Sequence, residues 1–216
     1  MMQFEKELQG IRTVAIAGHI RPDGDCVGAC IGLWHYIREN FEQIQADIFL
    51  ENPDEKFAVL EGFDKIRQAE EEDRDYDCFI ALDCAVCERL GAAAGYFDRA
   101  GKTICVDHHV SNSGFADVQV IDPDASSTCE VLCRMMEPEK ISVRAASALY
   151  MGIAHDTGVF QYSCTSPSTM RAAAELLEKG VDAPRIIRDT YYEKTYAQHQ
   201  VLGRALLESI MFLDGK

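Results

Sequence analysis

The sequence is poor in basic residues. It has 21 lysine and arginine residues against 36 aspartate and glutamate residues, which gives a formal net charge of −15. A surface this acidic repels polyanions at long range, which argues against long duplex nucleic acid as a partner. A small anionic substrate remains compatible with this charge, because bound cations invert the local field inside a cleft.

Long apolar runs are also missing, and this absence bears on where the protein works. No stretch of about 18 consecutive apolar residues occurs, so no membrane-spanning helix and no membrane partner is predicted. The first residues lack the basic and apolar segments of a secretory leader. The nine cysteines are odd in number and several lie in apolar runs, which is typical of reduced thiols in a cytoplasmic protein. Cys84-x-x-Cys87 has half the spacing of a zinc site, but no second Cys-x-x-Cys pairs with it.

Short apolar runs alternate with helical patterns along most of the chain. The predicted strands are 13–18, 46–50, 78–82, 102–106 and 116–121. The predicted helices are 26–40, 55–62, 87–100, 128–136, 142–154, 167–179, one beginning at Pro184, and 195–213, with a solvated connection at 70–77. Strands separated by helices predict an α/β fold, a parallel-sheet αβα sandwich with a helical C-terminal part that packs on the same sheet.

Four loops that follow apolar runs carry acids or histidines. Their polar residues are His19, Asp23 and Asp25; Asp83; Asp107, His108 and His109; and Asp156. Parallel strands end at one edge of a sheet, so the first three loops should converge there. Each also has a structural explanation: Asp25 as a helix cap, Asp83 as a strand end, Asp156 as a helix exit, and Asp107-His108-His109 as a surface loop.

Histidine together with several carboxylates is a ligand set for divalent ions of intermediate hardness, such as manganese. Six such side chains are too many for one ion with open positions, but they suit two ions that share a bridging carboxylate. Asp23 and Asp25 flank Gly24 in a tight turn and can reach neighbouring ions. The adjacent His108 and His109 are expected to point in different directions, one toward an ion and one toward a substrate.

Five motifs together resemble the DHH phosphoesterase superfamily, and within it the RecJ-like branch of nanoRNases that also act as phosphatases on 3′-phosphoadenosine 5′-phosphate (pAp). The matching stretches are Gly18-His-Ile-Arg-Pro-Asp-Gly-Asp-Cys-Val-Gly28, Ala81-Leu-Asp-Cys84 with Arg89-Leu-Gly91, Val106-Asp-His-His-Val-Ser-Asn112, Ala125-Ser-Ser-Thr128 with Glu130, and Gly152-Ile-Ala-His-Asp-Thr-Gly-Val-Phe160. They follow the order of the family from about residue 13 to 170.

The resemblance implies a centre of two Mn²⁺ ions, with Mg²⁺ or Co²⁺ as alternatives, that activates water against a phosphate ester. The first ion would be held by His19, Asp23 and Asp83, and the second by Asp25, Asp83, His108 and Asp156. The catalytic contacts implied are His109 on the substrate phosphate and Asp107 as the acid that orients an imidazole. Short RNA and small nucleotides are the implied substrates, and a homodimer is compatible with the sequence.

One feature of the family is missing from this sequence. The resemblance implies a second, substrate-binding domain, which in this family carries a glycine-rich motif ending in histidine. No Gly-Gly-Gly-His motif occurs in this sequence. We expect a catalytic domain over 1–190 and a linker helix over 191–216, with the second domain absent. Two alternatives remain open. One is a metal- or nucleotide-binding module without catalysis. The other is a manganese-dependent inorganic pyrophosphatase, although its first loop resembles Pro-Asp-Thr-Asp-Ser and this chain has Pro-Asp-Gly-Asp-Cys.

Overall fold

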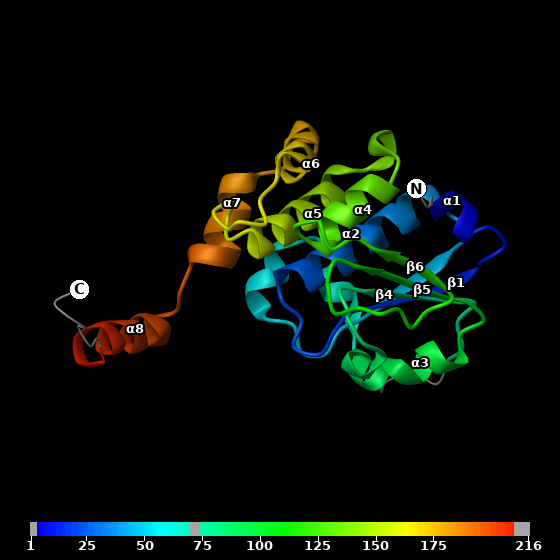
Figure 1. Cartoon of the computed structure of the whole chain (residues 1–216), viewed down its shortest axis with the longest axis horizontal. Coiled ribbons are helices and arrows are strands. Elements are labelled where there is room, and N and C mark those ends of the chain that lie inside the picture. Colours follow the sequence, from blue (N-terminus) through cyan, green and yellow to red (C-terminus); the bar gives the residue numbers. More distant parts are fainter. Residues whose placement is uncertain (1–3, 70–73, 210–216) are drawn as a thin grey trace.

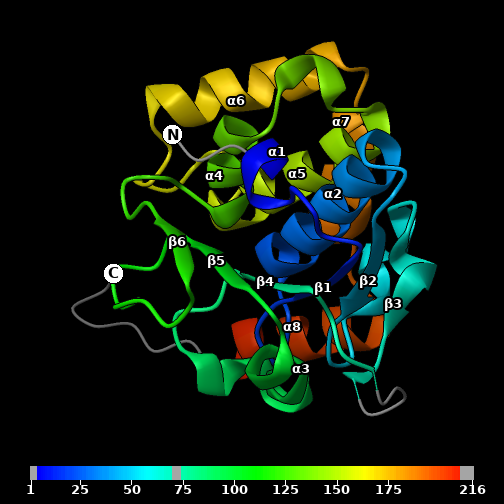
Figure 2. The same cartoon turned by 90° about the vertical axis from the view of Figure 1, so that its right-hand side faces the viewer.

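The computed structural model describes residues 4–69 and 74–209, which form a six-stranded parallel sheet in the order β3-β2-β1-β4-β5-β6 (Figures 1 and 2). The strands are β1 Thr13–Ala17, β2 Gln45–Phe49, β3 Ile66–Arg67, β4 Cys78–Leu82, β5 Thr103–Asp107 and β6 Val118–Ile121. The predicted α/β class is confirmed. The predicted strands correspond to five of the six, whereas the edge strand β3 has too few residues to show a periodicity.

The strand order reverses between β1 and β4, which creates a switch point at the carboxyl edge of the sheet. From β1 the chain adds β2 and β3 on one side, then returns to add β4, β5 and β6 on the other. Ala17 of β1 pairs with Ala81 of β4. Two residues further along each strand direction, the same register brings His19 opposite Asp83. Ligands of open α/β sheets bind at such a point, because the two diverging loops leave a crevice between them.

Helices cover both faces of the sheet, unequally. They are α1 Phe4–Glu7, α2 Gly24–Asn40, α3 Ala94–Arg99, α4 Thr128–Met135, α5 Val143–Asp156, α6 Pro167–Glu178, α7 Ala183–Ile187 and α8 Tyr196–Glu208. Short 3₁₀ segments are η1 Glu55–Val59, η2 Phe63–Lys65, η4 Cys87–Ala93 and η5 Pro138–Lys140, and η6 Arg188–Tyr192 is a π-helical turn. Figure 1 shows α2, α4, α5 and α6 on one side of the sheet and α3 on the other.

Two predicted helices are shorter or broken in the structure. The helix expected at 55–62 is only the 3₁₀ turn η1. The helix expected at 87–100 is interrupted at Gly91, whose φ of 57° and ψ of −134° lie outside the helical region. Such a backbone is accessible to glycine because it has no Cβ. The chain therefore runs as η4 and then as α3 in place of one continuous helix.

The C-terminal helices form a second layer. The helix α4 contacts β5, but α5 packs mainly on α2 and α6 packs on α5, so the expectation that all of them lie on the sheet is wrong. Glycines bring α2 and α5 together: a Cβ on Gly28 would lie 2.5 Å from the Ala148 carbonyl oxygen. A Cβ on Gly152 would lie 2.8 Å from Asp25 Oδ1. This close packing places the end of α5 beside the start of α2.

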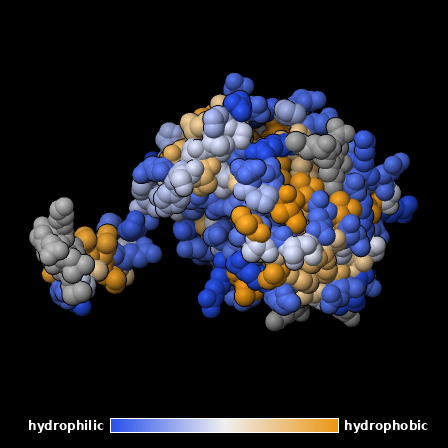
Figure 3. All heavy atoms as spheres, in the orientation of Figure 1, coloured by the Kyte–Doolittle hydropathy of each residue, from blue (hydrophilic) through white to orange (hydrophobic). Residues whose placement is uncertain are grey.

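The helix α8 extends away from the main body and has no buried residue (Figure 1). Figure 3 shows apolar residues on this arm, while hydrophilic residues predominate elsewhere on the visible face. Among the described residues no helix has the length and apolarity to cross a membrane. The expected division into 1–190 and 191–216 stays a prediction, and residues 70–73 of the expected solvated connection lie outside the described residues.

Candidate metal centre

His19 and Asp83 meet at the switch point of the sheet. His19 follows β1, and its Nε2 lies 3.4 Å from Oδ2 of Asp83, the residue directly after β4. Asp83 is 2 % exposed and adopts a left-handed backbone with φ of 54°. Among non-glycine residues aspartate and asparagine tolerate this conformation best. The turn aims the Asp83 carboxylate across the edge of the sheet instead of along the strand.

The two carboxylates of the Asp23-Gly24-Asp25 turn have different roles. One caps the helix α2, and the other turns into the cluster of acids and histidines. Asp23 caps α2, because its Oδ1 accepts hydrogen bonds of 3.1 Å from the backbone N–H groups of Asp25 and Cys26. The other Asp23 oxygen lies 3.7 Å from His19 Nε2. The alternative that Asp25 caps the helix is therefore wrong, and Asp25 is free to turn inward.

Asp25 is fully buried and is held by the N-terminus of α4. Its Oδ2 accepts a 2.6 Å hydrogen bond from Thr128 N–H, and its Oδ1 accepts a 3.0 Å bond from Cys129 N–H. The positive end of the helix dipole favours a carboxylate there. Thr128 also donates its hydroxyl to Asp83 Oδ1 at 3.1 Å. The start of α4 thus orients two of the predicted ligands at once.

Asp107, at the end of β5, is buried and orients the histidines that follow it. Its Oδ1 accepts from His108 N–H and lies 2.8 Å from His109 Nδ1, and its Oδ2 accepts from the Asn112 amide at 2.7 Å. Burial raises the pKa of Asp107, but the bonds from His109 and Asn112 outweigh it and lower the pKa overall. Asp107 is therefore a carboxylate that fixes a ring.

Both histidine rings face Asp83, so the expectation that they point in different directions is wrong. His108 Nε2 and His109 Nδ1 each lie 3.6 Å from Asp83 Oδ1. The reason is that β5 ends at Asp107, after which a turn replaces the alternation of a strand. His108 also reaches Asp156, with 3.2 Å between its Nε2 and Asp156 Oδ2, which joins the end of α5 to the cluster.

The side chains fall into three overlapping groups whose potential ligand atoms lie within 4.8 Å of one another. These groups are His19 with Cys26 and Asp83, Asp83 with His108 and His109, and Asp25 with His108 and Asp156. Among the described residues Asp23 belongs to none of the three groups, and its side chain contacts their members at His19 Nε2 and at the N–H groups of Asp25 and Cys26. Cys26, a buried thiol, was not among the predicted site residues because its sequence context resembles a core cysteine.

The electrostatics of the cluster favour a cation. Burial and the charges of Asp83 and Asp156 raise the pKa of Asp25 well above its usual range. Burial lowers the pKa of His19, but its bonds to Asp23 and Asp83 outweigh this and raise it to about 11. These shifts show that the cluster gathers more negative charge than its own groups offset, and a bound divalent ion would offset that charge. Carboxylate oxygens and imidazole nitrogens are donors that suit manganese and similar ions.

Glu130 belongs to one of the five matching motifs, but the sequence does not assign it a role in the site. The spacing of Ser127 and Glu130 predicts a capping box, but only half of it forms, with Glu130 N–H donating to Ser127 Oγ. The buried Glu130 carboxylate instead accepts from Ser126, Ser168 and Thr169 and contacts Arg134. It therefore fixes the turn that presents Thr128 to Asp25 and Asp83.

His155 lies against the Asp23–Asp25 turn from the side of α5. Its Nε2 is 2.9 Å from the Thr190 hydroxyl, and burial, with Lys56 nearby, lowers its pKa to about 4. A Cβ on Gly24 would lie 2.2 Å from the ring. The absence of a side chain at Gly24 lets the neutral ring contact the turn.

Substitution of Gly24 by alanine is expected to displace the turn that carries Asp23 and Asp25. A clash of this kind with a partly buried ring costs about 1–3 kcal/mol in the free energy of unfolding. The measurement is urea unfolding of Gly24→Ala and of Gly203→Ala, whose new methyl group meets nothing within 4 Å. Equal stability of the two variants would show that the His155 contact is not tight.

Comparisons with known proteins identify the family of this chain. The sequence model of the DHH family, N-terminal domain, matches residues 13–153. The chain is 28% identical over 184 residues to the probable bifunctional oligoribonuclease and PAP phosphatase NrnA of Streptococcus mutans, covering 84% of this chain and 57% of that protein. It is 27% identical over 188 residues to NrnA of Bacillus subtilis, covering 84% and 58%. The chain thus spans less than three fifths of the length of these relatives.

A solved structure has the same fold. It is an exopolyphosphatase-related protein from Bacteroides fragilis, which superposes with a TM-score of 0.87 at 24% identity and covers 95% of this chain and 64% of that one. A putative family II inorganic pyrophosphatase from Methanococcus jannaschii superposes with a TM-score of 0.59 at 16% identity, covering 82% and 61%. At these identities the likeness describes the fold alone.

Proposed function

The chain belongs to the DHH family, and on this premise we propose that it is a metal-dependent phosphoesterase that hydrolyses short oligoribonucleotides or pAp. The observation that carries the proposal is that four separate segments form one cluster of acids and histidines: His19, His108 and His109 approach Asp83, and Asp156 joins through His108. Relatives named as oligoribonucleases and PAP phosphatases support the substrate class.

The donor set at the switch point fits two manganese ions. We propose that His19, Asp23 and Asp83 hold one ion. We propose that Asp25, Asp83, His108 and Asp156 hold the other. When bound, such ions supply an activated water molecule and neutralise the charge of the phosphoryl group. The overlapping groups around Asp83 support its place as the shared ligand.

The histidine that meets the substrate in this proposal is His109. Its Nδ1 lies 2.8 Å from Asp107, which leaves Nε2 for the phosphate, and its side chain is 34% exposed. The bond to Asp107 raises the pKa of His109 more than burial lowers it. A ring that holds its proton at Nε2 can donate to a phosphate oxygen or to the leaving oxygen. Asp107 acts through His109 by fixing its orientation.

A hydrolysis assay tests the proposed function. The chain is incubated with manganese and with a short oligoribonucleotide, pAp or inorganic pyrophosphate, and products are separated by chromatography. We expect release of mononucleotides or of phosphate from pAp, and loss of both on chelation. Turnover of pyrophosphate alone would support the pyrophosphatase alternative. Binding of pAp without turnover would support a module without catalysis.

A further inference from the structure

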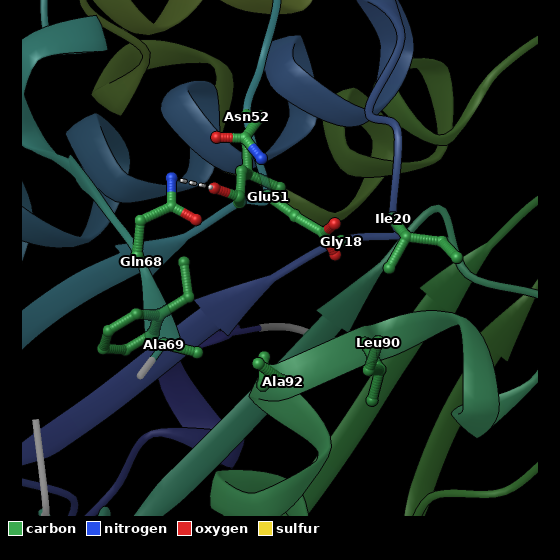
Figure 4. Close-up of a pocket in the computed structure, with 11 residues that line it drawn as sticks. Gly18, Ile20, Glu51, Asn52, Gln68, Ala69, Leu90 and Ala92 are labelled. Carbon is green, nitrogen blue, oxygen red and sulfur yellow. Dashed lines mark hydrogen bonds between the residues drawn. The ribbon is translucent and has the colours of Figure 1, made fainter. Parts of the chain in front are cut away.

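A pocket of about 300 Å³ lies beside the candidate metal centre, between the ends of β1, β2 and β3 and the segment η4 (Figure 4). Its walls combine apolar side chains with polar groups, and among the apolar residues Leu50 and Leu90 are buried while Ala92 is exposed on the η4 side. Its volume falls at the lower end of the range for small-ligand sites, which also pair apolar walls with a few polar groups. None of its described lining residues belongs to the metal groups described above.

The polar groups of this pocket are neutral or acidic. Glu51 and Asn52 follow β2, and Gln68 follows β3. Figure 4 shows Glu51 extending across the pocket toward Gly18 and Ile20, while Gln68 donates to the Leu50 carbonyl oxygen at 3.3 Å. Within residues 4–69 and 74–209, Glu51 and Asn52 have no side-chain hydrogen bond or ion pair. With no lysine, arginine or histidine among the described lining residues, the pocket disfavours a phosphate group.

The backbone around the pocket is held in conformations that keep it open. Asn52 adopts φ of 46°, which aims the chain away from the sheet directly after Glu51. Gly91 is also left-handed, and a Cβ there would lie 2.6 Å from Ile20 and 3.2 Å from the Glu51 carboxylate. Left-handed non-glycine residues carry strain of about 1–3 kcal/mol and cluster at ligand sites. A side chain at residue 91 would thus collide with Ile20 and the Glu51 carboxylate, two residues that line the pocket.

The pocket and the metal centre share one wall. Gly18 lines the pocket and directly precedes His19. A Cβ on Gly18 would lie 3.3 Å from the Leu50 side chain, which lines the pocket. It would also lie 3.2 Å from the carbonyl oxygen of Leu82, the residue before Asp83. Ile20 N–H donates to the Arg89 carbonyl oxygen at 2.7 Å, which ties the His19 loop to η4. A molecule in the pocket would therefore lie next to a phosphate held at His19 and Asp83.

We propose that this pocket binds the nucleoside part of a nucleotide whose phosphate lies at the metal centre, an inference that rests on the function proposed above. The base lies against Leu50, Leu90 and Ala92. The Glu51 carboxylate accepts a hydrogen bond from an amino group of the base or from a ribose hydroxyl. The Asn52 amide offers both a donor and an acceptor. A neutral, flat ligand with polar edges matches this lining, whereas a bare phosphate does not.

The test compares a ligand that has a nucleoside with one that lacks it. Binding of 5′-AMP and of inorganic phosphate to the full chain is measured by calorimetry with manganese present. We expect 5′-AMP to bind at least tenfold more tightly than phosphate. In Ala92→Trp, whose indole fills the pocket, this ratio falls to about one. The control Ala174→Trp places the same side chain on the exposed face of α6 and keeps the ratio.

A second variant keeps the test valid if Ala92→Trp fails to fold. Glu51→Ala removes an exposed side chain, and we expect it to reduce the ratio of the two affinities at least threefold. Equal affinities of the wild type for 5′-AMP and phosphate, or an affinity ratio that is unchanged in both variants, would contradict nucleoside binding in the pocket. Neither result would contradict the proposed metal centre. Selective 5′-AMP binding without hydrolysis of any nucleotide supports the pocket and contradicts the proposed activity. Failure of both ligands to bind contradicts both.

Discussion

Replacement of Asp83 by asparagine is expected to lower kcat/KM for hydrolysis more than ~100-fold. Asp83 is the residue that His19, His108 and His109 all approach, and the Thr128 hydroxyl donates to it. Loss of a partner that only orients a metal ligand costs about 10–100-fold in affinity or activity. Loss of the carboxylate shared by both proposed ion sites should cost more.

Asparagine is the informative replacement because it preserves the backbone. It tolerates the left-handed φ of 54° at this position and has the shape of aspartate, so lost activity reflects lost charge. The matched control is Asp98→Asn on the exposed surface of α3, which should retain wild-type activity. Retention of more than a tenth of the activity in Asp83→Asn would contradict the shared-ligand role.

The same variant has a readout that does not depend on catalysis. An ion that binds only the folded chain stabilises it by about 2.7 kcal/mol at a concentration of 100 times its Kd. For a chain of this size that corresponds to a rise in Tm of about 5–11 °C. We expect manganese to raise the Tm of the wild type and of Asp98→Asn, and to have little effect on Asp83→Asn. Calorimetry with and without the ion measures the difference.

Replacement of Glu130 by alanine is expected to destabilise the fold by about 3–5 kcal/mol, the cost of breaking a buried charge pair. The carboxylate is 0% exposed, and its removal takes away the acceptor of the Ser168 and Thr169 hydroxyls and one partner of Arg134, which keeps its contact with Asp122. Chemical denaturation measures the loss. The control Glu178→Ala, exposed at the end of α6, should change stability by less than about 0.5 kcal/mol.

The loss of stability in Glu130→Ala is expected to be larger at neutral pH than at acidic pH. Burial raises the pKa of Glu130, but hydrogen bonds from Ser168, Ser126 and Thr169 outweigh it and lower the pKa from its ordinary 4.5 to about 2. A carboxyl group whose pKa is lower in the folded than in the unfolded chain stabilises the fold at pH values above its unfolded-state pKa. This stability is lost as the pH falls through its folded-state pKa. The stability difference between wild type and Glu130→Ala should thus be largest above pH 5 and shrink toward pH 2. A difference constant across that range would contradict the charge-based role.

The elements that sequence predicts well are those whose evidence is local. The predicted strand 78–82 is an uninterrupted apolar run and 102–106 contains the apolar run 104–106, and in the structure every residue of β4 and β5 is buried. Convergence of the loops after β1, β4 and β5 follows from parallel strands sharing an edge. Asp156 belongs to α5 instead of a strand, and only tertiary packing of α5 on α2 brings it to His108.

The details that sequence does not determine depend on partners far along the chain. Whether Asp23 or Asp25 caps α2 is decided by Thr128 and Cys129, whose N–H groups draw Asp25 inward. The Glu130 network needs Ser168 and Thr169 from another helix. In the same way, the orientation of His108 and His109 depends on where β5 stops, because beyond Asp107 a turn places both rings near Asp83.

The hydrogen bonds of Asp25 have a consequence for the order of events in folding. They join residues separated by 103 and 104 positions, so the second half of the described chain must be present before this carboxylate reaches its place. Contacts of such large sequence separation form late, because the entropy of closing the intervening loop must be overcome first. A nascent chain that ends before α4 would carry His19, Asp83 and His108 without the arrangement that gathers them. Assembly of the proposed metal site would then wait for synthesis of α4, so that shorter nascent chains lack a preformed site.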